Sequence, residues 1–288
     1  MSIVITGASG QLGRKVAEKL IDRVDPSDLV LVTRTPESLA DFADKGAVVR
    51  HGDFDDPSTL SAAFAGGDRL LLISTDSIGA RLAGHKAAIE AATNAGVGFV
   101  AYTSVIKPEP PNPARVAPDH FATEQALRQS DLAWSFLRNS VYAHMQLDAA
   151  QAALATGKLF TNAGDGRTSY VTREDCAAAA AAVLAGGDHD NTIYDITGPE
   201  ALDAAALSAL FAEFGAGAVE PVYLDDATYA AGLVQSGLPE PVAELLASFG
   251  AAARDGYADV VSDSVLELTG RPPTALRAVL ESGLRPAN

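Results

Sequence analysis

Three glycines near the N-terminus give the clearest chemical signal in the chain. They lie in the segment Gly7-Ala8-Ser9-Gly10-Gln11-Leu12-Gly13, between the apolar run Ile3-Val4-Ile5 and a helical pattern. In such a unit the first glycine allows a tight turn, the second lets backbone N–H groups approach a pyrophosphate, and the third lets the helix pack on the strand. The helix N-terminus favours the anion. The spacing predicts a dinucleotide-binding loop; the alternative is a glycine-rich turn without a ligand.

The end of the next apolar run indicates which dinucleotide is bound. Leu29-Val30-Leu31-Val32 is followed by Thr33 and Arg34, at the place where NAD-specific Rossmann proteins usually have Asp or Glu. An arginine there can form charge-assisted bonds to a 2′-phosphate. We therefore expect NADPH rather than NADH; the alternative is that Arg34 is only solvated.

Residues that follow the later strands are expected to complete the cofactor site, because ligands of open α/β sheets bind outside the carboxyl ends of the strands. By position, they are Asp53 and Phe54 for the adenine, Ile73, Ser74 and Thr75 for the ribose and pyrophosphate, Thr103 and Ser104 toward the nicotinamide, and Asn139 and Tyr142 bordering the nicotinamide. Polar residues at strand ends also cap loops, so each assignment has that alternative.

The usual proton donor of short-chain dehydrogenases is missing, since no tyrosine has a lysine four residues further on. The nearest positional counterpart is His120, with Glu124 one helical turn later. A His–Glu pair could keep an imidazole protonated for general acid catalysis; the alternative is a helix-stabilising pair. Tyr102, Lys107 and Tyr142 are further candidates to assist catalysis.

Because the usual proton donor is missing, we expect an electron acceptor whose reduced form needs little help from an acid. An alkoxide has a conjugate acid with a pKa near roughly 15.7, whereas a quinone gives a phenolate with a pKa of about 10. The difference of roughly 6 units corresponds to about 8 kcal/mol. We therefore expect a quinone-like, electron-poor small molecule as the electron acceptor.

Short apolar runs alternate with helical patterns through the first half, which predicts an α/β, Rossmann-type, doubly wound parallel sheet. Residues 1–142 are assigned to the NADP-binding domain, with a returning strand near 192–197. Residues 143–288 are assigned to a smaller, mainly helical substrate-side lobe, with a hairpin around Asn162 to Gly166.

Composition excludes several other classes. The 288 residues carry a formal net charge of −16 without a basic run, so nucleic acid is an unexpected partner. Cys176 is the single cysteine and the histidines are scattered, so no metal site is expected. An export signal and a membrane-spanning apolar run are both missing, which predicts a cytoplasmic protein. Homo-oligomer formation stays open.

Several of these segments together resemble the NmrA-like group of atypical short-chain dehydrogenase/reductases. They are Thr6 to Gly13, Leu70 to Ser74, Ala101 to Ser104, Leu137-Arg138-Asn139 and Gly164-Asp165-Gly166. The subgroup most similar is the NADPH-dependent quinone oxidoreductase type 2, with triphenylmethane reductase as a relative. The resemblance implies NADPH in a cleft between two domains, with the C-terminal lobe closing over the acceptor. The proline-rich segment from Lys107 to Pro113 departs from that pattern.

The sequence thus predicts an enzyme, an NADPH-dependent oxidoreductase that transfers hydride to a quinone-like acceptor. Two alternatives remain open: an NADP(H)-sensing, NmrA-like regulator without turnover, and a reductase of carbonyls or imines.

Overall fold

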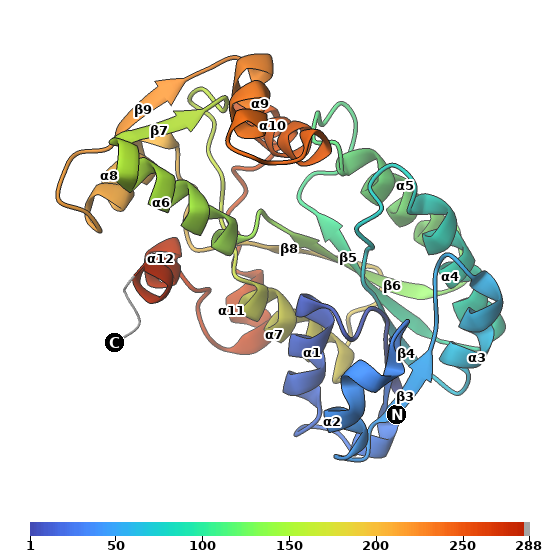
Figure 1. Cartoon of the computed structure of the whole chain (residues 1–288). Coiled ribbons are helices and arrows are strands. Elements are labelled where there is room, and N and C mark those ends of the chain that lie inside the picture. Colours follow the sequence, from blue (N-terminus) through green and yellow to red (C-terminus); the bar gives the residue numbers. More distant parts are fainter. Residues whose placement is uncertain (285–288) are drawn as a thin grey trace.

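The apolar runs of the first half form a seven-stranded, wholly parallel sheet (Figure 1), in a computed structural model that describes residues 1–284. The strand order is β3-β2-β1-β4-β5-β6-β8. The strands are β1 (Ile3–Ile5), β2 (Leu29–Thr33), β3 (Val48–His51), β4 (Arg69–Leu72), β5 (Phe99–Val105), β6 (Ala133–Asn139) and β8 (Thr192–Ile196). The order reverses between β1 and β4, as in Rossmann folds, which confirms the expected fold class.

Helices cover both faces of the sheet because the strand side chains alternate between two apolar cores. In β1, for example, Ile3 and Ile5 join one core and Val4 the other. The first core is covered by α1 (Gln11–Leu20), α2 (Ala40–Ala43), α7 (Arg173–Leu184) and α11 (Ser264–Thr269). The second is covered by α3 (Leu60–Phe64), α4 (Leu82–Asn94) and α5 (Ala117–Arg128).

The remaining elements build the second lobe. They are β7 (Lys158–Thr161), β9 (Glu220–Tyr223), α6 (Gln146–Thr156), α8 (Ala204–Ala212), α9 (Asp226–Gln235), α10 (Glu240–Arg254) and α12 (Leu276–Leu284). Of these, β7, α6, α8 and α12 share an apolar core of their own, whereas α10 packs against residues 114–117. The expected hairpin near Asn162 is wrong: β7 pairs in parallel with β9, a strand that the sequence did not predict. Within residues 1–284, no helix has both the length and the apolar character needed to cross a membrane.

The chain passes between the two lobes more than once. β8 returns to the sheet beside β6, and α7 and α11 pack on the first core although they follow residue 142. A domain boundary at residue 142 therefore stays a prediction. It separates β1 to β6 from the second lobe, but it leaves α7 and α11, which pack on the first core, on the wrong side.

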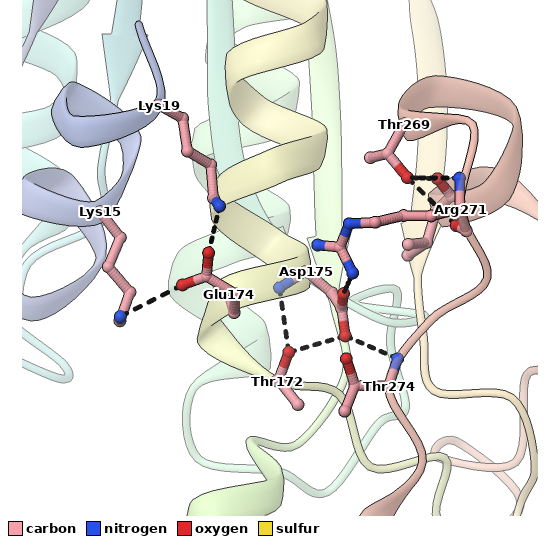
Figure 2. Close-up of polar contacts among 9 residues, drawn as sticks. Lys15, Lys19, Thr172, Glu174, Asp175, Thr269, Arg271 and Thr274 are labelled. Carbon is pink, nitrogen blue, oxygen red and sulfur yellow. Dashed lines mark hydrogen bonds and ion pairs between the residues drawn. The ribbon is translucent and has the colours of Figure 1, made fainter. Parts of the chain in front are cut away.

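A buried carboxylate at the start of α7 ties this helix to the C-terminal segment (Figure 2). Asp175 is 0% exposed, and its Oδ2 accepts hydrogen bonds from Thr172 Oγ1 at 2.7 Å and from the Thr274 backbone N–H at 2.9 Å. Its Oδ1 lies 2.8 Å from Nη1 of Arg271. The C-terminal segment is thus anchored to α7 by a charge that water does not reach.

The neighbouring Glu174 ties α7 to α1. Its carboxylate pairs with Lys15 at 3.2 Å and with Lys19, as Figure 2 shows. These side chains are partly exposed, so the ion pairs add little stability by themselves. Together with the alanine-rich surface of α7, they keep the two helices in register on the first core.

We expect Arg271→Ala to destabilise the protein markedly, because it leaves the carboxylate of Asp175 buried without a cation. Breaking a buried ion pair costs about 3–5 kcal/mol, and because Arg271 is 43% exposed we expect about 2 kcal/mol, measured by urea denaturation. The matched control is Arg277→Ala, which breaks an exposed pair with Glu213 and should change stability much less. Equal losses in the two variants would contradict the anchoring role.

Candidate functional site

A cleft of about 1220 Å³ lies at the carboxyl ends of the parallel strands. One wall comes from the loops that follow β1 to β6. The opposite wall comes from α10 and the segment after it. The cleft therefore lies where open α/β sheets bind their ligands. Among residues 1–284, no group of three or more metal-ligating side chains gathers in a common site.

The glycine loop forms the end of the cleft beneath α1. Gly7 has φ +59°, a left-handed conformation that side chains disfavour. A Cβ on Gly13 would lie 2.3 Å from the carbonyl oxygen of Gly7, so only glycine lets α1 approach the loop after β1 so closely. Gly10 caps α1 without a side-chain bond, and the first turn contains no acidic residue. The backbone N–H groups of this turn are thus presented to an anion.

Every predicted loop residue except Ala8 lines the cleft; they are Gly7, Ser9, Gly10, Gln11, Leu12 and Gly13. Ala8 is fully buried, and its N–H donates to the carbonyl of Val32. Ala8 therefore faces the protein core and holds the loop against β2.

Arg34 lies at the rim of the cleft, at the end of β2. It is exposed, and it forms no ion pair with any residue of the described part of the chain. Its neighbour Thr33 is buried, and its Oγ1 forms a hydrogen bond with Oγ of Ser9 in the glycine loop at 2.7 Å. A free guanidinium beside the glycine loop is suited to a phosphate on the adenosine ribose.

Residues at or just after the carboxyl ends of the next strands line the middle of the cleft, as the topology requires. They are Asp53, Phe54, Ile73, Ser74, Thr75, Thr103 and Ser104. Hydroxyl groups fix the ends of these strands: Thr6 Oγ1 accepts the N–H of Ile73 at 3.0 Å, and Thr103 Oγ1 accepts the N–H of Ser74 at 2.9 Å. The loops are therefore held in place before any ligand binds.

Asn139 and Tyr142 close the far end, and Arg173 joins them. Asn139 lines the cleft, and its buried Oδ1 accepts no hydrogen bond from the described residues, so this acceptor is left unused. Arg173 lies over the Tyr142 ring at 4.9 Å and lines the cleft. Arg173 is not recognisable as a site residue from the sequence, because only folding brings the start of α7 to this point. Burial raises the pKa of the Tyr142 hydroxyl, which therefore stays protonated.

The glycine cradle, the free guanidinium of Arg34 and the unpaired Asn139 oxygen together fit a dinucleotide. The cradle offers backbone donors to a pyrophosphate, and Asn139 offers an acceptor at the opposite end. The long shape of the cleft, which touches the loops after six strands, matches an extended ligand of that kind.

The expected pair between His120 and Glu124 is wrong. Glu124 binds Arg138 instead, with Oε2 at 2.7 Å from Nη2 and Oε1 at 3.0 Å from Nε, and it accepts the Ser104 hydroxyl at 2.6 Å. His120 binds the hydroxyl of Tyr102 through Nδ1 at 2.8 Å. Burial and the charge of Arg81 lower the pKa of His120 well below its ordinary value, so its imidazole is neutral.

A second buried group fixes the loop after β4. Arg81 donates to the carbonyl of Thr75 at 3.0 Å and pairs with Asp119 at 3.2 Å, and Asp119 accepts the N–H of Gly79 at 2.7 Å. His85 accepts the N–H of Thr75 at 3.3 Å. No sequence pattern indicates this cluster, because its members come from two segments that contact each other only in the folded chain.

Lys107 lies outside the cleft lining. Its ammonium donates to the carbonyl of Gly256 at 2.8 Å and pairs with Asp259 at 3.1 Å, which joins the proline-rich segment to the second lobe. A catalytic role for Lys107 stays a prediction, and these contacts favour a structural one.

The buried His85 makes stability depend on pH. Burial and Arg81 lower its pKa from 6.5 to about 4, so the unfolded chain binds a proton that the folded chain refuses. Stability is therefore lost as the pH falls from 6.5 toward 4. We expect His85→Gln to lose about 2 kcal/mol less than the wild type between about pH 7 and about pH 5, measured by denaturant unfolding. The exposed His51→Gln is the control, and equal losses in His85→Gln and wild type would contradict this account.

Comparison with known proteins agrees with the geometry of the cleft. Residues 7–186 match a family model described as NAD(P)H-binding. Quinone oxidoreductase 2 of Escherichia coli is 37% identical over 274 residues, covering 95% of this chain and 96% of that protein. The crystal structure of the E. coli NADPH-dependent quinone oxidoreductase complexed with NADPH superposes with a TM-score of 0.92, at 36% identity, covering 97% of this chain and 99% of that one.

Two further relatives match nearly the whole length of the chain. Triphenylmethane reductase of a Citrobacter species, complexed with NADP(H), gives a TM-score of 0.90 at 33% identity, covering 98% of this chain and 100% of that one. An NmrA-like family domain-containing oxidoreductase of Aspergillus flavus is 29% identical over 283 residues, covering 95% of this chain and 92% of that protein. With a dinucleotide cleft and relatives of this kind, the chain belongs to the NAD(P)H-binding, NmrA-like family of oxidoreductases.

Proposed function

We propose that this protein is an NADPH-dependent reductase that delivers hydride to a quinone-like, electron-poor small molecule. The observation that carries the proposal is that one cleft has two walls of different character. A dinucleotide cradle lies on the sheet side, and an apolar wall formed by Val242, Leu245, Phe249 and Tyr257 faces it from the second lobe. An apolar wall of this kind suits a flat, weakly polar acceptor.

The residues proposed to hold the cofactor are the glycine loop, Arg34 at the 2′-phosphate, the strand-end residues from Asp53 to Ser104 that line the cleft, and Asn139 with Tyr142 at the nicotinamide end. When bound there, NADPH supplies the hydride. The protein supplies position and excludes water. Its relatives named as reductases of quinones and of triphenylmethanes support an acceptor of the electron-poor class.

The acid chemistry of the cleft also favours a quinone-like acceptor. His120 is held neutral, and burial raises the pKa of Tyr142, so neither is a strong acid near neutral pH. Reduction of a carbonyl gives an alkoxide, which needs such an acid. Reduction of a quinone gives a phenolate, whose conjugate acid has a pKa of about 10, and this product does not need one. The same groups would serve a ketone or an imine poorly.

The first experiment is NADPH oxidation by the purified protein with a panel of benzoquinones and naphthoquinones, run beside NADH and a carbonyl panel. We expect rapid quinone-dependent loss of NADPH, a much slower reaction with NADH, and little reaction with carbonyls. Tight NADPH binding without turnover on any acceptor would contradict the reductase and support an NADP(H) sensor. Faster carbonyl turnover would assign the acceptor to that class instead.

Arg34 should determine the preference between the two cofactors. We expect Arg34→Glu to weaken NADPH binding by about 2 kcal/mol or more, through loss of a charge-assisted phosphate contact, and to change NADH binding far less. Titration calorimetry with both cofactors measures this. The control is Arg23→Glu, which makes the same charge change on an exposed residue outside the cleft. Equal losses for NADPH and NADH would contradict the 2′-phosphate contact.

A further inference from the structure

A buried tyrosine and a histidine form a hydrogen-bonded pair at the floor of the cleft. Tyr102 of β5 is 0% exposed, and its hydroxyl lies 2.8 Å from Nδ1 of His120 of α5, which is 3% exposed and lines the cleft. Within the described chain, Nε2 of His120 contacts no hydrogen-bonding group and is not among the fully enclosed polar atoms. The Nε2 edge of the ring is therefore the part that meets the cleft.

The direction of this bond follows from the neighbouring protons. Thr123 Oγ1 donates its proton to a carbonyl of its own helix at 2.8 Å. His85 accepts the N–H of Thr75 through Nε2, so its ring proton is on Nδ1 and is donated to Thr123 Oγ1 at 3.0 Å. Thr123 Oγ1 is already engaged with His85, so we assign the Tyr102 hydroxyl proton to its partner at 2.8 Å, Nδ1 of His120. In a neutral imidazole the remaining ring proton is then on Nε2.

The surroundings keep both partners uncharged. Burial is the largest cause that lowers the pKa of His120, followed by Arg81 and His85, and burial raises the pKa of Tyr102. The carboxylate on the same helix, Glu124, is neutralised by its two bonds to Arg138. The charged or titratable groups around the pair are thus Arg81, His85, Asp119, Glu124 and Arg138.

We propose that Tyr102 is a positioning residue that holds His120 as a neutral Nε2–H donor, and that His120 gives this hydrogen bond to the acceptor oxygen that becomes negative during reduction. The inference rests on the proposed reductase function. Hydride forms a new bond to the acceptor, the displaced electron pair moves to an acceptor oxygen, and solvent then supplies the proton. A neutral imidazole keeps its own proton and stabilises the developing charge by hydrogen bonding.

The tautomer can be tested without turnover, by nitrogen NMR of protein labelled with ¹⁵N-histidine, free and with NADP⁺. The His120 signals are assigned by their loss in His120→Gln. We expect a protonated Nε2 and an unprotonated Nδ1, unchanged between about pH 6 and about pH 8, a range that spans the ordinary histidine pKa. Tyr102→Phe should give a mixture of tautomers. A protonated Nδ1, or an imidazolium that titrates in this range, would overturn the proposal.

Kinetics test the donor role with a matched control. We expect His120→Leu to lower kcat by about 100-fold, the effect typical of one lost oxyanion donor, and His120→Gln to recover part of the loss because its amide N–H can donate. Tyr102→Phe should lower kcat with little change in the KM for NADPH. The control is Tyr170→Phe, which removes a hydroxyl from a buried tyrosine outside the cleft lining.

Two results would count against the proposal in different ways. If Tyr102→Phe matches Tyr170→Phe in kcat, or His120→Leu matches wild type, the pair does not act on the acceptor. If the wild type consumes no NADPH with any quinone, the proposed function fails and the donor role fails with it, while the NMR result still decides whether Tyr102 sets the tautomer.

Discussion

Helix α1 can pack directly against the glycine loop that follows β1 because Gly13 has no side chain. A Cβ there would meet the Gly7 carbonyl oxygen at 2.3 Å and the Cα of Ala8 at 2.9 Å. This contact sets the position of the α1 N-terminus over the cleft, and α7 then packs along α1. The start of α7 in turn holds Asp175, to which the C-terminal segment is anchored. One close backbone contact thus positions both the anion cradle and the elements behind it.

A second constraint comes from charges buried beside the cleft. Arg138 is matched by Glu124, and Arg81 by Asp119, so these guanidinium groups have carboxylate partners inside the protein. Burying paired charges is costly, which implies that their geometry serves the site. Arg81 and Asp119 fix the loop after β4, and the same positive charge opposes protonation of His85 and His120. The two histidines therefore stay neutral, and they can take part in hydrogen bonds without acting as strong acids.

Signals within one segment of sequence predicted the fold well, because strand patterns and the glycine loop are local. The family resemblance, the cofactor class and the parallel sheet all follow from such local signals. Pairing between distant segments does not. The carboxylate of Glu124 binds Arg138 of β6 and not His120, which lies one helical turn away. A bidentate ion pair is stronger than a hydrogen bond to a neutral imidazole. Likewise, β7 pairs with β9, about sixty residues later, and does not form a hairpin with the segment that follows it directly.

The central claim, that NADPH and the acceptor meet in one ordered cleft, is tested most directly by stereospecific deuterium transfer. NADPH deuterated at one or the other position of nicotinamide C4 would be oxidised by the protein with a naphthoquinone, and the deuterium retained in NADP⁺ would be measured by mass spectrometry. A fixed cofactor predicts complete loss of the label from one form and complete retention in the other. Equal loss from both forms, or NADPH that stays bound and unoxidised, would contradict the claim.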